Sequence, residues 1–438
     1  MPSFSIFLKF FINFRYIKEA KCIYINSDQF GHSVSDSLIF IESFGPKTLV
    51  ISLGTESNLQ STTERNRFFD KCLGNNLIGI YFPKHVIKNQ IWKFINPLAK
   101  KIIKIFLIIL LNRDCLIYIS KSEFLRESYT RIIQKKFTMT LGEAITIVDK
   151  LDFKVFTGNK FLYPLGYLSF LMSNTRINSN LIYKEINSSL LKISQDRLLN
   201  KSFVCLAIRR SNSLYNSNSD YYFDAIDAIN SAGFMVSVIG DRKYFLEISK
   251  KWNYPAADRT NNADLSDYDQ KVFELLAIEN CAFVIGDQGG IWSLVKAFNK
   301  AGLIINAWPV SHLQNNVESL PKKWVYKATG QELLDVNIIF NELFFKWTQE
   351  SKIVKSFEEQ VISSVNTEIP DCVTSEQNDI DTIIKVLKRY MGGYVHLAPK
   401  KLQSVVIKNF QENIFLQIAE NVSYSEEYVS KLTGWKIV

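Results

Sequence analysis

Two segments of the sequence combine phosphate-binding residue types with the turns that would present them. The first, Gly286-Asp-Gln-Gly-Gly290, follows an apolar run and precedes residues with helical spacing. Glycine permits close approach of a ligand to the backbone, and the free N–H groups of a helix start attract phosphate. The second, Arg209-Arg210, follows another apolar run, and paired guanidinium groups suit a diphosphate. The competing interpretations are a tight turn and a surface arginine pair.

Three further side chains fall in turns where chemistry is expected. Asp241 follows an apolar run and is a candidate acceptor for a ribose hydroxyl or a base, with a turn-forming aspartate as the alternative. His32 lies in the first turn of the N-terminal half, and Asp36 follows one helical turn later. A histidine there is a candidate general base or oxyanion ligand, and the alternative is a structural histidine.

The sequence lacks the motifs of several reaction classes. The sequence has no GxSxG nucleophile elbow and no Walker A loop. The six cysteines are far apart and form no CxxC pair, so zinc-ligand spacing is absent and a reducing cytoplasm is expected. Asp379-Ile-Asp381 falls in a helical setting and is interpreted as a solvated helix face. We therefore expect no metal and no cofactor.

The elements that would position these residues alternate between strand and helix, twice over. Short apolar strands separated by helices predict parallel sheets covered on both faces, with ligands at the carboxyl ends of the strands. The expected fold class is α/β, with two Rossmann-like domains facing a cleft and C-terminal helices. The expected strands are 22–26, 48–52, 77–81, 115–119, 203–208, 234–239, 282–285 and 303–306, and the expected helices are 33–44, 221–231, 269–279 and 291–299.

Three regions follow from this alternation. We expect an N-terminal Rossmann-like domain over 1–175 and a second Rossmann-like domain over 200–347. The remainder, 348–438, has no strand pattern and is predicted to be a helical tail that packs back on the body. Its expected helices are 380–390 and 401–433.

Composition limits the choice of partner. The chain has 438 residues, 47% of them hydrophobic, and a net charge of +9. The basic residues are spread out, which favours an anionic ligand or a membrane surface over nucleic acid. Segments 1–21 and 84–112 are apolar but interrupted by basic residues, and the apolar runs within them are shorter than the roughly 20 residues that span a bilayer. They are interpreted either as membrane-interfacial segments or as core helices.

The strand end Leu206-Ala-Ile-Arg-Arg210 resembles that of the fucosyltransferase-like glycosyltransferases of GT-B fold. The chain is more closely similar to a family of bacterial glycosyltransferases linked to surface polysaccharides, thinly over 20–55 and well over 203–306. Ala207 and Asn212 stand where the fucosyltransferases have His and Asp, so fucose is not carried over. The matching stretches are Phe30-Gly31-His32, Ile208-Arg-Arg-Ser-Asn212, Gly233-Phe-Met-Val-Ser-Val-Ile-Gly-Asp241 and Phe283-Val-Ile-Gly-Asp-Gln-Gly-Gly290.

This resemblance implies metal-independent transfer of a sugar from a nucleotide-activated donor to a glycan or lipid-linked glycan acceptor. It makes 1–175 the acceptor domain and 200–347 the nucleotide-sugar domain. His32 or Asp36 would deprotonate or orient the acceptor hydroxyl. The basic-apolar segments would hold the cytoplasmic enzyme at the inner face of the cell membrane. The residues expected to bind the donor are Arg209, Arg210, Asp241, Asp287, Gln288, Gly289, Gly290 and Ser293.

Two other functions fit the same residues. A sugar-nucleotide epimerase of GT-B-like fold would share the phosphate site and need no lipid acceptor. A non-catalytic module that binds glycan or nucleotide is the second alternative, because Ala207 replaces a histidine and the 286–290 turn lacks the serines of the family. Loss of turnover in an Arg209 variant would distinguish an enzyme from such a module.

Overall fold

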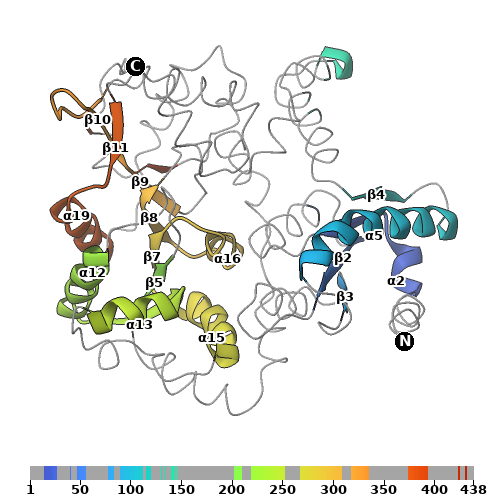
Figure 1. Cartoon of the computed structure of the whole chain (residues 1–438), viewed down its shortest axis with the longest axis horizontal. Helices are drawn as coiled ribbons and strands as arrows, with labels where there is room; N and C mark the ends of the chain where they lie inside the picture. Colours follow the sequence, from blue (N-terminus) through green and yellow to red (C-terminus); the bar gives the residue numbers. More distant parts are fainter. Residues whose placement is uncertain are drawn as a thin grey trace. The chain divides into compact units, whose positions relative to one another are not determined.

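The chain divides into two compact units, each with its own sheet. Unit 1 comprises Met1–Thr157, Asn174–Leu191 and Ser266–Val272, and unit 2 comprises Gly158–Ser173, Lys192–Leu265 and Phe273–Val438. The computed structural model (Figure 1) describes residues 14–26, 40, 47–55, 77–82, 89–111, 115–119, 130, 134, 140–143, 145, 202–209, 219–251, 267–307, 317–334, 373–392, 423–424 and 430–431.

Unit 1 is built on a parallel four-stranded sheet. Its strands are β1 (Cys22–Asn26), β2 (Thr48–Thr55), β3 (Leu77–Phe82) and β4 (Leu116–Tyr118), in the order β3-β2-β1-β4. Cys22 pairs with Thr48 on one side and Leu116 on the other. Helices α2 (Phe14–Glu19) and α5 (Asn89–Leu110) belong to this unit. All four strands expected in the N-terminal half are therefore confirmed.

Both faces of the first sheet are covered, as a parallel sheet requires. Ile23 and Ile25 of β1 share a buried cluster with Ile17 of α2 and Leu107 of α5. Tyr24 points to the opposite face, because side chains alternate along a strand, and stacks on Phe40 with ring centroids 3.9 Å apart. The core-helix interpretation of segment 84–112 thus holds for the inner side of α5.

Unit 2 is built on a six-stranded parallel sheet whose order is β12-β9-β8-β7-β5-β6. Its strands β5, β8 and β9 are buried at every residue, which is typical of a sheet covered on both faces. The strands are β5 (Phe203–Ile208), β6 (Met235–Gly240), β7 (Val284–Asp287), β8 (Gly302–Ala307), β9 (Val317–Pro321) and β12 (Ser423–Tyr424). The helices between them are α12 (Ser219–Ser231), α13 (Arg242–Lys251), α15 (Asp267–Asn280) and α16 (Trp292–Ala297).

The four strands and three helices expected between 203 and 306 are present within about two residues of their predicted limits. Helix α13 and strand β9 were not predicted from the sequence, because polar residues interrupt the apolar spacing that indicated the other elements. Cys205 and Cys281 are buried free thiols, as expected of small apolar residues in strand-like runs.

The C-terminal region differs from the helical tail that was expected. Residues Val373–Glu376 form β11, which pairs antiparallel with β10 (Lys323–Tyr326). Ser423–Tyr424, inside the expected helix 401–433, form β12 at the edge of the main sheet. The expectation that this region lacks strands is wrong, because each of these short polar segments is held by a partner strand that lies far away in the sequence.

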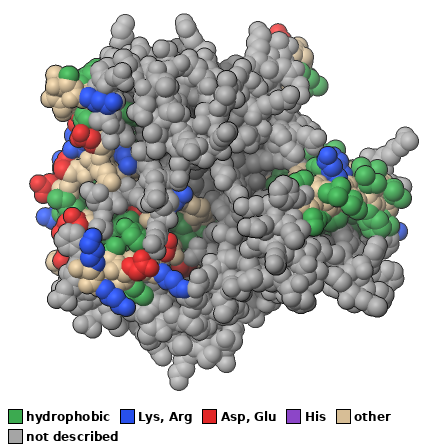
Figure 2. Space-filling view, in the orientation of Figure 1, with side chains coloured by type: hydrophobic (Ala, Val, Ile, Leu, Met, Phe, Trp, Pro, Cys, Tyr) green, Lys and Arg blue, Asp and Glu red, His purple; other side chains and the backbone are tan. Residues whose placement is uncertain are grey.

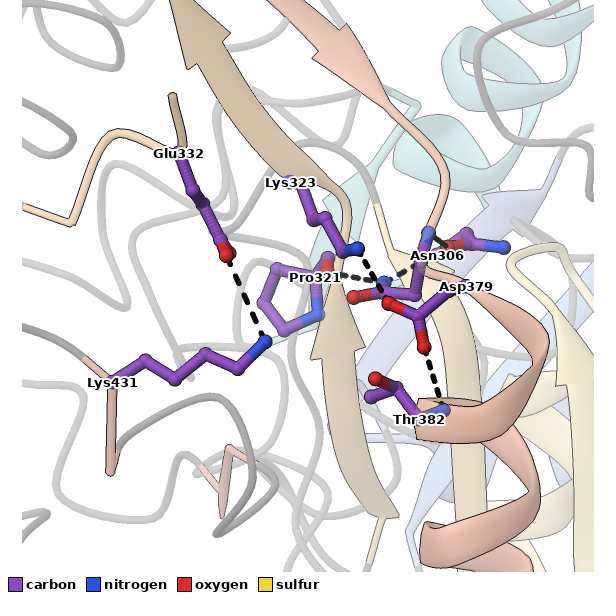
Figure 3. A network of polar contacts seen from close by, with 8 residues as sticks. Asn306, Pro321, Lys323, Glu332, Asp379, Thr382 and Lys431 are labelled. Carbon is purple, nitrogen blue, oxygen red and sulfur yellow. Dashed lines mark hydrogen bonds and ion pairs between the residues drawn. The ribbon is translucent and has the colours of Figure 1, made fainter. Parts of the chain in front are cut away.

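The helix expected at 380–390 is confirmed as α19 (Ile380–Met391), which packs against α12. Figure 3 shows how its start is fixed: the Asp379 carboxylate accepts from the Thr382 N–H at 2.8 Å and pairs with Lys323 at 2.5 Å. Asn378 donates from its side chain to Asn306 at 2.9 Å and to the Pro321 carbonyl at 2.7 Å. Residues 377–391 are thereby attached to the ends of β8 and β9.

The sheets confirm the expected α/β class with two Rossmann-like units. The cleft and the domain limits at 175, 200 and 347 stay predictions. The helix expected at 33–44 lies outside the described residues except for Phe40, which is helical. Among the described helices, none combines the length and the hydropathy that a bilayer span requires.

Candidate functional site

The candidate site lies at the carboxyl edge of the second sheet. Because all six strands are parallel, their carboxyl ends meet at one edge. β5 ends at Ile208 and is followed by Arg209, and its neighbour β7 ends at Asp287 and is followed by Gln288. Arg209 and the 286–290 turn therefore lie at one edge of the sheet.

Arg209 lies directly against this turn. Its guanidinium Nη1 donates to the Gln288 carbonyl at 3.1 Å, and its backbone N–H donates to Asp287 Oδ2 at 3.4 Å. A Cβ atom added at Gly289 would lie 3.8 Å from the Arg209 side chain. The half-buried cation is thus held beside the glycine pair, where it and the turn's N–H groups can meet the same anion.

Asp287 has a structural position in the turn rather than an open one. Only 2% of the residue is exposed, and its carboxylate accepts from the Tyr222 hydroxyl as well as from the Arg209 N–H. Its carbonyl accepts from Trp292 Nε1 at 2.7 Å. Burial and the Asp287 charge raise the pKa of Tyr222 well above its usual range, so the phenol stays a donor. Asp287 therefore positions Arg209 and the start of α16.

Two glycines let the neighbouring strands end so close to β5. Gly286 has φ +145°, and a Cβ there would come within 2.0 Å of the Ala207 carbonyl oxygen. Gly240, at the end of β6, has φ +92°, and its Cβ would come within 2.3 Å of the Ile208 carbonyl oxygen. Both distances exclude a side chain, so glycine is required on each side of β5 at this edge.

Lys322, which the sequence analysis did not identify, follows β9 at the same edge. The residue is 6% exposed, and burial lowers the pKa of its ammonium to about 8, while the Asp287 carboxylate acts in the opposite direction. No ion pair of Lys322 is found among the described residues. If β9 had been predicted, Lys322 would have been a candidate, because it directly follows a strand as Arg209 does.

Asp241 follows β6 and caps a helix. Its Oδ1 accepts from the Tyr244 N–H at 3.3 Å at the start of α13, and its own N–H donates to the Ile208 carbonyl at 2.8 Å. The buried Glu274 carboxylate accepts from the Gly240 N–H at 3.2 Å. Asp241 therefore caps α13, and its half-buried side chain lies at the same edge as Arg209.

The remaining expected residues are only partly described. Gln288 is buried, Gly289 is half-buried and Gly290 is exposed in the turn. His32, Asp36 and Arg210 lie outside the described residues, as does the side chain of Ser293, whose backbone is in α16. Within the described part of the chain, no group of three or more His, Cys, Asp or Glu residues is arranged to hold a metal ion.

Comparison with solved structures finds chains that align at low identity. The E. coli ADP-heptose LPS heptosyltransferase II is 11% identical, with a TM-score of 0.38 over 68% of this chain and 89% of that chain. A glycosyl transferase family 9 structure from Veillonella parvula is 9% identical, with a TM-score of 0.41 over 86% and 99%. The UDP-GlcNAc 2-epimerase from Methanocaldococcus jannaschii is 10% identical, with a TM-score of 0.26 over 82% and 81%.

No family model and no curated protein matches the sequence. Likeness to structures at these identities and TM-scores assigns no activity. The chemistry of the candidate site is therefore the basis for a function.

Proposed function

We propose that the protein is a glycosyltransferase that moves a sugar from a nucleotide-activated donor to a glycan or lipid-linked glycan acceptor. The observation that carries this proposal is the Arg209 guanidinium, held at 3.1 Å on the Gln288 carbonyl beside the Gly289-Gly290 turn. A cation and the backbone N–H groups of a glycine turn at one strand edge suit the diphosphate of such a donor.

Arg209 would act on the leaving group. When the bond between the sugar and the diphosphate breaks, negative charge grows on the leaving oxygen, and a fixed guanidinium stabilises that charge more than it stabilises the substrate. Lys322 offers a second cation at the same edge, held in a buried position. With two cations for this charge, transfer without a metal ion is the mechanism that we propose.

The other expected residues complete the proposal. His32 or Asp36 would deprotonate or orient the acceptor hydroxyl, and Arg210 would add a second guanidinium on the donor. The Ser293 hydroxyl would contact a phosphate at the start of α16. Asp241 would serve indirectly, by holding the start of α13 next to the site. We further propose a role in surface polysaccharide synthesis.

The first test is thermal stabilisation by UDP, GDP, CMP, ADP and dTDP, each with and without EDTA. A nucleotide at about 100 times its Kd should stabilise the protein by about 2.7 kcal/mol. We expect one nucleotide to stabilise the protein regardless of EDTA, and Arg209→Ala to abolish the effect. Lys251→Ala is the matched control, because Lys251 is an exposed cation of unit 2 at the opposite end of α13 from Asp241. Absence of stabilisation by every nucleotide would contradict the proposal.

Turnover then separates the transferase from the two alternatives. A transferase releases the nucleoside diphosphate from its sugar nucleotide only when an acceptor is present. An epimerase converts the sugar nucleotide to an isomer without any acceptor, and a binding module does neither. Arg209→Ala should reduce transfer at saturating donor as well as affinity, because the guanidinium is proposed to stabilise the leaving charge.

A further inference from the structure

Helix α5 carries apolar side chains on two faces, and only one of these faces is packed. Leu107 is fully buried in the core of unit 1, and Ile103 and Leu111 pack against the same cluster. A second set of apolar residues recurs at intervals of four, three and four, which places it on one other face of the helix. This apolar stripe consists of Leu98, Ile102, Ile105 and Ile109.

The apolar stripe is open to solvent along its length. The exposed fraction is 58% for Leu98, 58% for Ile102, 59% for Ile105 and 80% for Ile109. Figure 2 shows a continuous hydrophobic surface over α5 with basic side chains at its border. A helix of a globular protein normally presents charged or polar residues on its outer face, so an apolar outer face marks a surface that binds a partner.

The charge of α5 indicates the kind of partner. The helix contains Lys93, Lys100, Lys101 and Lys104 and no Asp or Glu. Lys101 is exposed and directly precedes a residue of the stripe. Lysines close to an exposed apolar face fit the anionic headgroups of a bilayer. A second copy docking through the same face would bring two all-positive helices together, which is unfavourable.

We propose that α5 docks unit 1 on an anionic lipid bilayer. The apolar stripe enters the interfacial region, and Lys101 meets the headgroups. The helix lies along the surface and does not cross, because its lysines divide the apolar sequence and no described helix meets the requirements of a span. This proposal rests on unit 1 and does not depend on the reaction proposed above.

The test is flotation of the full chain with lipid vesicles. We expect the protein to float with phosphatidylcholine vesicles containing about one third phosphatidylglycerol, and to float less with phosphatidylcholine alone. The double variant Ile105→Gln/Ile109→Gln should reduce vesicle binding at least about tenfold, because two large apolar side chains no longer enter the interface. Both residues are exposed, so the melting temperature should not fall.

A matched control is available in the same unit. Leu141 and Ile145 are also four residues apart on a helical segment and are 51% and 40% exposed. Leu141→Gln/Ile145→Gln should bind vesicles like the unchanged protein. Lys101→Gln should weaken binding to the anionic vesicles and leave binding to phosphatidylcholine unchanged.

Two outcomes would overturn the proposal: the unchanged protein floats with neither vesicle, or the stripe variant floats as well as its control. If the stripe variant floats unchanged and also converts a dimer into a monomer, the stripe is a protein interface. Because flotation involves no donor and no turnover, failure here is distinguishable from failure of the proposed glycosyltransferase activity.

Discussion

At the scale of single residues, the candidate site contains two cations, and only one of them follows a strand that the sequence predicts. Arg209 follows six consecutive buried residues, so its place at a strand end is visible in the sequence. Lys322 follows Val-Glu-Ser-Leu-Pro, in which apolar and polar residues are mixed. The structure buries this strand completely, because Glu318 is paired with Arg389. Lys322 could not be predicted without that distant partner.

Burial of Lys322 predicts a dependence of stability on pH. Its ammonium has a pKa of about 8 in the folded protein and an ordinary value of 10.5. Between these values the unfolded chain holds a proton that the folded chain has released, so this group makes stability rise with pH from about 8 to about 10.5. The contribution amounts to about 3 kcal/mol across that interval.

Chemical denaturation of the unchanged protein and of Lys322→Met at several pH values measures this effect. The free energy of unfolding of the unchanged protein should gain on that of the variant as the pH rises through the interval. Lys243→Met is the control for the loss of a lysine side chain at an exposed position. Parallel pH profiles for the unchanged protein and Lys322→Met would contradict the prediction.

At the scale of elements, the glycines at the strand ends set the spacing of β5, β6 and β7. Gly286→Ala would place a Cβ within 2.0 Å of a backbone oxygen of β5, so the two strands must separate. Gly233→Ala also changes a glycine with positive φ, +85°, but nothing lies within 4 Å of the added atom. The first substitution should therefore cost at least about 2 kcal/mol more stability than the second.

Urea unfolding of both glycine variants measures the difference. Because Gly286 precedes Asp287 in the turn, Gly286→Ala should also weaken nucleotide binding, while Gly233→Ala should not. Equal destabilisation by the two substitutions would mean that β5 and β7 are not held at the distance described.

Elements with continuous apolar sequence were predictable, and elements fixed by distant contacts were not. The limits of two strands were predicted correctly because their sequences are almost entirely apolar: Phe203–Ile208 throughout, and Cys22–Asn26 except for Asn26. Ser423–Tyr424 carries no such pattern, and only its pairing with β9 makes it a strand. The contact between Arg209 and the glycine turn joins residues 79 positions apart, so only their common edge could be expected.

At the scale of the whole molecule, the C-terminal region belongs to unit 2 and is fastened by a buried ion pair. Arg389 of α19 donates to both carboxylate oxygens of Glu318, with Nη1 3.1 Å from Oε2, and Glu318 is fully buried. Arg389→Met would leave this carboxylate without its guanidinium, which should destabilise unit 2 by about 3 kcal/mol. Arg15→Met removes an exposed pair with Glu19 and should cost much less stability, because water and salt screen that pair.

Differential scanning calorimetry of the two arginine variants tests this prediction. Arg389→Met should lower the unfolding temperature by more than Arg15→Met does, because the carboxylate that it leaves is fully buried. A loss of stability no larger than that of Arg15→Met would show that α19 is not fastened through this pair.

The position of β12 has a consequence for the order in which the molecule is made. The first sheet is complete in sequence by Tyr118, but the edge strand of the second emerges from the ribosome roughly 300 residues later, at Ser423–Tyr424. At about 5–20 residues per second, translation separates these events by tens of seconds. β9 is itself complete roughly 100 residues before β12, so for about 5 to 20 seconds the nascent second unit exposes a strand edge on which a neighbouring nascent chain could pair.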